Sequence, residues 1–148
     1  MSHLWVFLHV LGFVMWLGGG IASMFAGIAS KSESRAGLGA VVRAQSAVQR
    51  MVIAPGALLT LLSGLMLTFA LAGMAGANVW LMIMQGAGLV AALLTLFIAL
   101  PTATRLSRLD PTGNQSAYFD ELRKRQKVVG MIWGSLGLLA LVGGTLVR

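Results

Sequence analysis

The chain has 148 residues, of which 57% are hydrophobic and only 10% charged, against roughly 25% charged in an average soluble domain. So little polar surface cannot cover a water-soluble particle of this size, which excludes a soluble enzyme, a disordered tail and a secreted disulfide scaffold. The chain has no cysteine, so disulfides, thiolate zinc sites and cysteine-ligated iron–sulfur clusters are excluded as well. We therefore predict an all-α, polytopic integral membrane protein.

Four uncharged apolar runs divide the chain, and each reaches the ~20 residues that a helix needs to cross the hydrocarbon core of a bilayer. None of them has the short alternating pattern of a barrel strand, so a helix is expected in every run. The predicted architecture is one transmembrane domain, residues 1–148, folded as a four-helix bundle. The spans are expected at about residues 4–29, 51–73, 78–100 and 128–147.

The charged residues lie almost entirely in two of the three connections between these runs. Residues 30–50 carry four bases against one acid, and residues 101–127 carry six bases against three acids. By the positive-inside rule both connections are predicted to be cytoplasmic, with both termini outside, in a bacterial-type inner (plasma) membrane. Topology thus explains the net charge of +7, and no nucleic-acid partner is expected.

Turn and charge signals predict the structure of the third connection, residues 101–127, in more detail. The segment 110–113, Asp-Pro-Thr-Gly, predicts a turn. A helix is expected to follow it into the fourth run, with Asp120 and Lys124 paired four residues apart. Pro55 is expected in the first turns of the second span and Pro101 at the end of the third.

Glycines at short spacings predict close contacts between the helices. We expect them to serve packing within the bundle, with a dimer face as the alternative. They are Gly18, Gly19 and Gly20, then Gly86 with Gly88, and Gly130 with Gly134.

The polar inventory inside the apolar runs is short. No Asp, Glu, Lys or Arg lies in any of them, so an ion pump with a carboxylate relay is not expected. The one clearly intramembrane titratable residue is His9. At 100° per residue it shares a helix stripe with Gly12, Phe13 and Trp16. Gly12 would leave room for a large flat ligand, and the two aromatic rings would wall it.

Soft and polar atoms are expected at the depth of His9 on the other helices. Counting from the outer ends places Ser63 and Met66 on the second span, and Met84 and Gln85 on the third. Imidazole with thioether suits haem iron and also copper(I). The alternative is a histidine that only hydrogen-bonds across helices, to Ser63 or Gln85, among methionines that only pack.

Two short motifs resemble a four-helix membrane superfamily. Leu8-His9-Val10-Leu11-Gly12, followed by Trp16-Leu17-Gly18-Gly19, is similar to its first span, and residues 49–55 followed by Gly64 are similar to its second. The superfamily includes HemJ-type protoporphyrinogen oxidases, the CopD-type copper-resistance membrane domain and related predicted integral membrane proteins. The resemblance implies a b-type haem, or copper in the CopD branch, with His9 as a ligand.

The leading hypothesis is therefore a haem b protein in electron transfer or in porphyrin- or quinone-linked redox chemistry, an oxidoreductase if it is an enzyme. His9 would be the axial ligand, its other ring nitrogen donating to a backbone, Ser or Gln oxygen. The expected cofactor-binding residues are His9, Gly12, Phe13, Trp16, Met66, Met84 and Gln85, with Met66 or Met84 as sixth ligand. His3, Asn78 and Arg148 are candidate partners for the haem propionates.

Two alternatives remain open on the sequence. One is copper handling, with His9, Met66 and Met84 as metal ligands. The other is a non-catalytic structural subunit of a larger membrane complex. The expected partners are the lipid bilayer and either further copies of this chain or other membrane subunits.

Overall fold

The computed structural model describes residues 2–71 and 79–146, which are helical except at two short links. The elements are α1 (Ser2–Ala29), η1 (Ser30–Ser32), α2 (Arg35–Val48), η2 (Gln49–Ile53), α3 (Ala54–Leu71), α4 (Val79–Leu94), η3 (Thr95–Ala99), α5 (Leu100–Leu106) and α6 (Ser116–Leu146). They form four continuous rods: α1 with η1, α2–η2–α3, α4–η3–α5, and α6. Each rod is long and apolar enough to cross a membrane, which confirms the all-α four-helix prediction.

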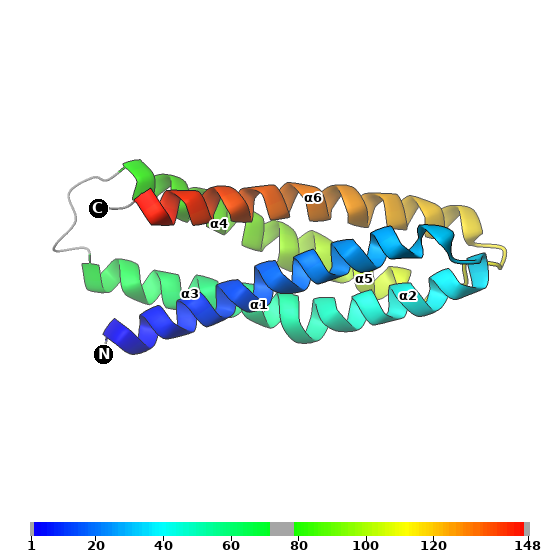
Figure 1. Cartoon of the computed structure of the whole chain (residues 1–148), viewed down its shortest axis with the longest axis horizontal. Helices are drawn as coiled ribbons and strands as arrows, with labels where there is room; N and C mark the ends of the chain where they lie inside the picture. The colour runs from blue at the N-terminus through cyan, green and yellow to red at the C-terminus, as the bar shows by residue number, and fades with distance from the viewer. Residues whose placement is uncertain (1, 72–78, 147–148) are drawn as a thin grey trace.

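The rods run along the long axis of the molecule as two closely packed pairs (Figure 1). The first rod packs mainly on α3, and α4 packs mainly on α6. Helix α1 begins and α6 ends at one end of the bundle, while the α1–α2 and α5–α6 links lie at the other. The arrangement places the start and the end of the described chain on the same side of the apolar region.

Pro55 and Pro101 lie inside continuous rods, so the prediction that each stands near a helix end is wrong. The second rod already begins at Arg35, and the third continues past Pro101 to Leu106. A proline lacks an N–H, and its ring clashes with the carbonyl four residues earlier in a regular helix. Each proline is preceded by a widened π-helical turn, in which Ala54 N–H donates to Gln49 and Leu100 N–H donates to Thr95. The wider turn accommodates the proline without ending the rod.

Large apolar side chains face outward along the rods, as a surface in contact with lipid requires. Met51 and Phe97 are each 72% exposed, and Phe69 is 68% exposed. The buried core between the rods is built instead from four alanines, one isoleucine and two tryptophans. Its members are Trp16, Ile53, Ala57, Ala91, Ala92, Ala99 and Trp133.

Glycines let the backbones within each pair touch, although only part of the predicted set does so. A Cβ on Gly56 would lie 2.7 Å from the Trp16 backbone nitrogen, and one on Gly143 would lie 3.2 Å from the backbone nitrogen of Met84. Gly19 and Gly20 also pack inside, against Ile53 and Trp133. The prediction of internal packing is wrong for Gly18, Gly86 and Gly134, where an added Cβ would meet nothing within 4 Å.

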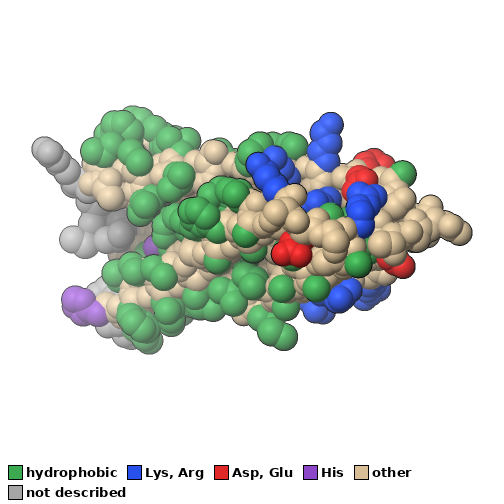
Figure 2. Space-filling model, turned by 45° about the vertical axis from the view of Figure 1, so that its right-hand side comes forward, with side chains coloured by type: hydrophobic (Ala, Val, Ile, Leu, Met, Phe, Trp, Pro, Cys, Tyr) green, Lys and Arg blue, Asp and Glu red, His purple; other side chains and the backbone are tan. Residues whose placement is uncertain are grey.

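The charged side chains gather at one end of the bundle, which we call the charged end (Figure 2). A second small core stabilises this end, made of Leu38, Val42, Leu106, Phe119 and Leu122. Arg35 makes a bidentate salt bridge with Asp120, with one N–O distance of 2.9 Å, so the predicted Asp120–Lys124 pair is wrong. The predicted turn at 110–113 is confirmed by hydrogen bonds from Thr112 and Gly113 to Asp110.

Candidate site around His9

His9 lies on α1 against a stripe of small residues on α3. The stripe repeats every four residues, which places its members on one helix face: Gly56, Thr60, Gly64 and Thr68. Gly12 crosses this stripe so closely that an added Cβ would lie 2.8 Å from the backbone nitrogen of Thr60. The prediction that Gly12 leaves room for a large flat ligand is therefore wrong, because the backbone of α3 fills that space. The close crossing brings the His9 ring, one turn earlier in α1, onto the backbone of α3.

One ring nitrogen of His9 is fixed by the facing helix. Nδ1 lies 2.9 Å from the carbonyl oxygen of Thr60 and 3.3 Å from the hydroxyl of Ser63. A carbonyl oxygen only accepts, so Nδ1 carries the proton and donates it to Thr60. In the neutral imidazole the lone pair is then on Nε2, and no described residue donates a hydrogen bond to that atom. The predicted bond to a backbone oxygen is thus present, and it leaves Nε2 able to bind an electrophile.

Gly64 determines how closely the ring approaches α3. A Cβ at this position would lie 3.0 Å from His9 Cε1 and 3.3 Å from Nδ1. A larger residue would push the imidazole away from the Thr60 carbonyl. The absence of a side chain at Gly64 therefore sets the position of the histidine.

The two aromatic residues of the His9 stripe pack into the core. Trp16 is 2% exposed, stacks on Trp133 with ring centroids 5.9 Å apart, and donates from Nε1 to the hydroxyl of Thr95. Phe13 meets Trp16 edge to face at 6.4 Å. These contacts tie α1 to the third and fourth rods just beyond His9. The role of Phe13 and Trp16 as cofactor walls stays a prediction.

Gln85 is brought to the same α3 stripe as His9. Its amide nitrogen donates to the hydroxyl of Thr68 at 2.8 Å, and Thr68 donates to the carbonyl of Gly64 at 2.9 Å. His9 therefore contacts α3 between Thr60 and Gly64, and Gln85, from a different rod, contacts it one turn later, at Thr68. Of the two partners expected for a histidine that hydrogen-bonds across helices, Ser63 is confirmed, whereas Gln85 bonds to Thr68.

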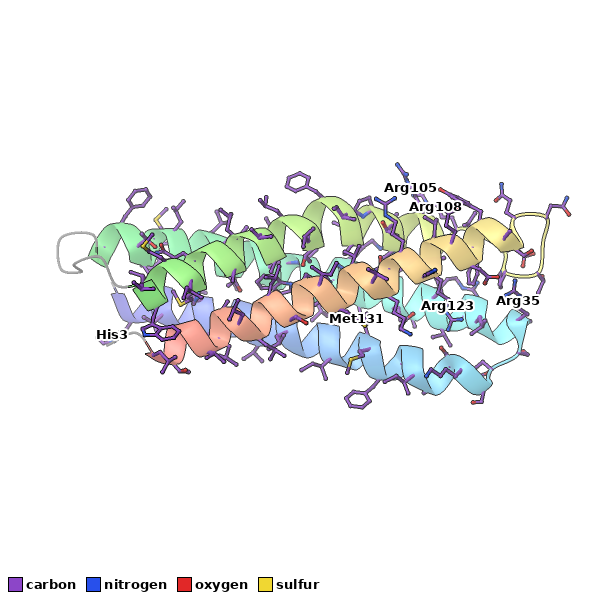
Figure 3. All side chains as sticks on the ribbon, turned by 90° about the horizontal axis from the view of Figure 1, so that it is seen from above. His3, Arg35, Arg105, Arg108, Arg123 and Met131 are labelled. Carbon is purple, nitrogen blue, oxygen red and sulfur yellow. The ribbon has the colours of Figure 1, made fainter. Side chains whose placement is uncertain are left out.

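The two candidate methionines lie in different surroundings. The sulfur of Met84 faces α6, where a Cβ on Gly144 would lie 3.0 Å from it. Met66 is 40% exposed on α3. Of the three groups near which haem propionates were expected, His3 is exposed in the first turn of α1 (Figure 3), and Asn78 and Arg148 lie outside the described residues.

Sequence reasoning found His9, Ser63 and Gln85 but missed the Thr60 carbonyl. A backbone acceptor carries no side-chain signal. The four-residue repeat of small residues from Gly56 to Thr68 was the available indication, because such spacing marks a helix face that another helix approaches closely. In residues 2–71 and 79–146, no group of three or more His, Asp, Glu or Cys residues could hold a metal ion. A metal held by His9 would therefore need a ligand outside that set.

Four apolar rods with outward-facing large side chains and one charged end define a multi-pass integral membrane protein. Residues 3–147 match the model of the family described as "Predicted integral membrane protein (DUF2269)", and the chain belongs to this family. No curated protein and no solved structure matched the chain. The resemblance to the HemJ-type and CopD-type branches stays a prediction.

Proposed function

We propose that this membrane protein binds a b-type haem, with His9 Nε2 as the axial ligand, and serves electron transfer or porphyrin- or quinone-linked redox chemistry. The observation that supports it best is the fixed imidazole, whose Nδ1 donates to the Thr60 carbonyl at 2.9 Å. Such a bond orients a ligating histidine and raises the basicity of its free nitrogen. A bound haem would supply an iron that exchanges single electrons and needs only one or two protein ligands.

The residues around His9 fit this group in their chemistry. Gly64 has no side chain that would push the histidine out of position. Gln85 of α4 places its amide at Thr68, one turn of α3 beyond Gly64.

Met66 and Met84 are both candidates for a second protein ligand; Met84 is the less exposed of the two, but its sulfur lies against Gly144 of α6. A haem held by His9 alone is the other arrangement that these residues would allow.

The charged end would face the cytoplasm of a bacterial-type inner membrane. It holds most of the excess of bases over acids, which is retained on the cytoplasmic side. His9 lies near the opposite end, in the half of the bilayer that would face outward. A membrane-soluble redox partner could reach the site there from within the bilayer.

Copper handling is supported less well than haem binding. Copper(I) takes two or more soft ligands, and the sulfur of Met84 lies against Gly144 of α6.

A structural subunit is the second candidate, favoured by a specific observation. Gly18, Gly86 and Gly134 present open glycine positions where a helix of another chain could approach.

An absorption spectrum of the gently extracted protein, oxidised and then reduced with dithionite, tests the proposal. We expect the haem spectrum in the native chain, its loss in His9→Ala, and its retention in Val14→Ala, which changes a side chain that is 61% exposed on the same helix. A colourless native protein that stays colourless after hemin is offered would show the proposal to be wrong. Copper without iron would favour copper handling, and stoichiometric partner chains with neither metal would favour a structural subunit.

A further inference from the structure

A polar cavity of about 320 Å³ lies at the charged end, between the start of α2 and the link that joins α5 to α6. Arg43 of α2 and Arg108 of the link both line it, together with Asp110 and Thr112. In Figure 3, Arg108 and the neighbouring Arg105 lie apart from Arg35 and Arg123 at this end. The cavity is thus a separate feature from the Arg35–Asp120 salt bridge and from the His9 site.

The charges that face the cavity sum to one positive charge. Arg43 and Arg108 are exposed, and the salt bridge found among the described residues involves neither of them. Asp110 is the opposing charge. Hydrogen bonds from the Thr112 hydroxyl and backbone N–H lower the pKa of Asp110, so its carboxyl group is ionised at neutral pH. One of its oxygens, Oδ1, already accepts both of these bonds.

Counting along the rods places the cavity at or just beyond the expected depth of the lipid headgroups. Arg50 and Arg105 border the uncharged stretches of the second and third rods. Arg43 is seven residues beyond Arg50, or ~10 Å, and Arg108 is three residues beyond Arg105, or ~5 Å. The headgroup layer on each side of a bilayer is roughly 5–8 Å thick, and a long arginine side chain can reach back toward it.

We propose that this cavity binds the phosphate of an anionic phospholipid headgroup between the guanidinium groups of Arg43 and Arg108. Guanidinium forks match phosphate oxygens in geometry and charge. A phosphodiester carries one negative charge and so balances the net positive charge of the cavity, whereas a zwitterionic headgroup would leave that charge uncompensated. The recognised group is phosphate, which a lipid or free inorganic phosphate could supply, and the lipid is favoured by the depth of the cavity.

Native mass spectrometry of the full chain in detergent tests this with dioleoylphosphatidylglycerol, dioleoylphosphatidylcholine and inorganic phosphate as separate probes. We expect the phosphatidylglycerol adduct to be the strongest. Replacing each arginine should weaken it about fivefold, and Arg43→Gln with Arg108→Gln roughly 30-fold. Lys124→Gln with Arg125→Gln removes the same charge from α6 outside the cavity, and should change binding less than about twofold.

Two further variants keep the proposal testable if the chain with Arg43→Gln and Arg108→Gln does not fold. Arg43→Lys with Arg108→Lys keeps the charge and should recover part of the binding. Asp110→Asn keeps an acceptor for Thr112 but removes the opposing charge, so it should strengthen phosphatidylglycerol binding. The proposal would be overturned if phosphatidylcholine bound as strongly as phosphatidylglycerol, or if the Lys124/Arg125 control lost as much phosphatidylglycerol binding as the Arg43/Arg108 pair. It would also be overturned if Asp110→Asn bound phosphatidylglycerol no more strongly than the native chain. Displacement of phosphatidylglycerol by an equal concentration of inorganic phosphate would overturn the lipid as the source.

Discussion

The smallest residues decide where the first two rods meet. A Cβ on Gly56 would lie 2.7 Å from the Trp16 backbone nitrogen and 2.8 Å from the Gly12 carbonyl oxygen. Both neighbours are backbone atoms, which cannot move aside as a side chain can. In a bilayer, where helices gain no hydrophobic energy by associating, such close contact is a main source of attraction between them. It also brings His9 within reach of the Thr60 carbonyl.

Gly56→Ala should therefore destabilise the protein, because the added methyl group forces α1 and α3 apart. We expect a loss of about 1–3 kcal/mol in the free energy of unfolding, measured by titration with sodium dodecyl sulfate in mixed micelles. The matched control is Gly18→Ala, since nothing lies within 4 Å of a Cβ there. That change should be neutral or stabilising by up to ~1 kcal/mol, because alanine favours helix. Equal effects of the two substitutions would contradict this reading of the crossing.

Part of the candidate site could be predicted at this scale and part could not. His9 was identifiable because an ionisable group inside an apolar run is rare, and Ser63 because it lies at the matching depth. The Thr60 carbonyl was not, since every residue has one and only the crossing of α1 and α3 selects it. The stacking of Trp16 on Trp133 could not be predicted either, because it joins two rods that are far apart in the sequence.

At the scale of elements, the second and third rods share one structural feature, a π-helical turn before a proline. Each has a π-helical turn of five residues, and each turn begins six residues before a proline, at Gln49 before Pro55 and at Thr95 before Pro101. Hydropathy identified the four rods that are long and apolar enough to cross a membrane, because it depends only on the apolar run. Hydropathy alone could not locate the ends of the rods, because they continue into the charged segments, where α2 and α6 are held by the small core around Phe119. The turn predicted at 110–113 did indicate the start of the last rod, since α6 begins at Ser116.

A π-helical turn holds one residue more than an α-helical path, so removing that residue should restore a regular helix with its faces in register. We expect the chain lacking Phe97 and carrying Pro101→Ala to stay folded and monodisperse in detergent, since Phe97 is 72% exposed. The control lacks Leu139 and also carries Pro101→Ala. Helix α6 has no such turn, so Trp133 and Gly143 could not both keep their contacts. Thermal unfolding of the two proteins compares them, and a control as stable as the Phe97 deletion would refute the expectation.

At the scale of the whole molecule, charge and apolar surface are segregated along one axis. Outward-facing apolar side chains cover the rods, and the charged end projects beyond them (Figure 2). A helix of 31 residues such as α6 is ~46 Å long, against ~30 Å for the hydrocarbon core. The excess length is the charged end, so the bundle crosses the bilayer in full and extends past it on one side.

This asymmetry predicts a topology that can be measured directly, because the native chain has no cysteine to react in the background. Single cysteines at Ser32, near the charged end, and at Thr145, in the last turn of α6, are both at exposed positions. In spheroplasts, a membrane-impermeant maleimide should label Thr145→Cys at once and Ser32→Cys only after the membrane is permeabilised. Ser63→Cys, at a position that is 0% exposed, should stay unlabelled in both conditions. The reverse pattern would place the charged end outside. Labelling of both exposed positions in intact spheroplasts would rule out the three crossings expected between Ser32 and Thr145.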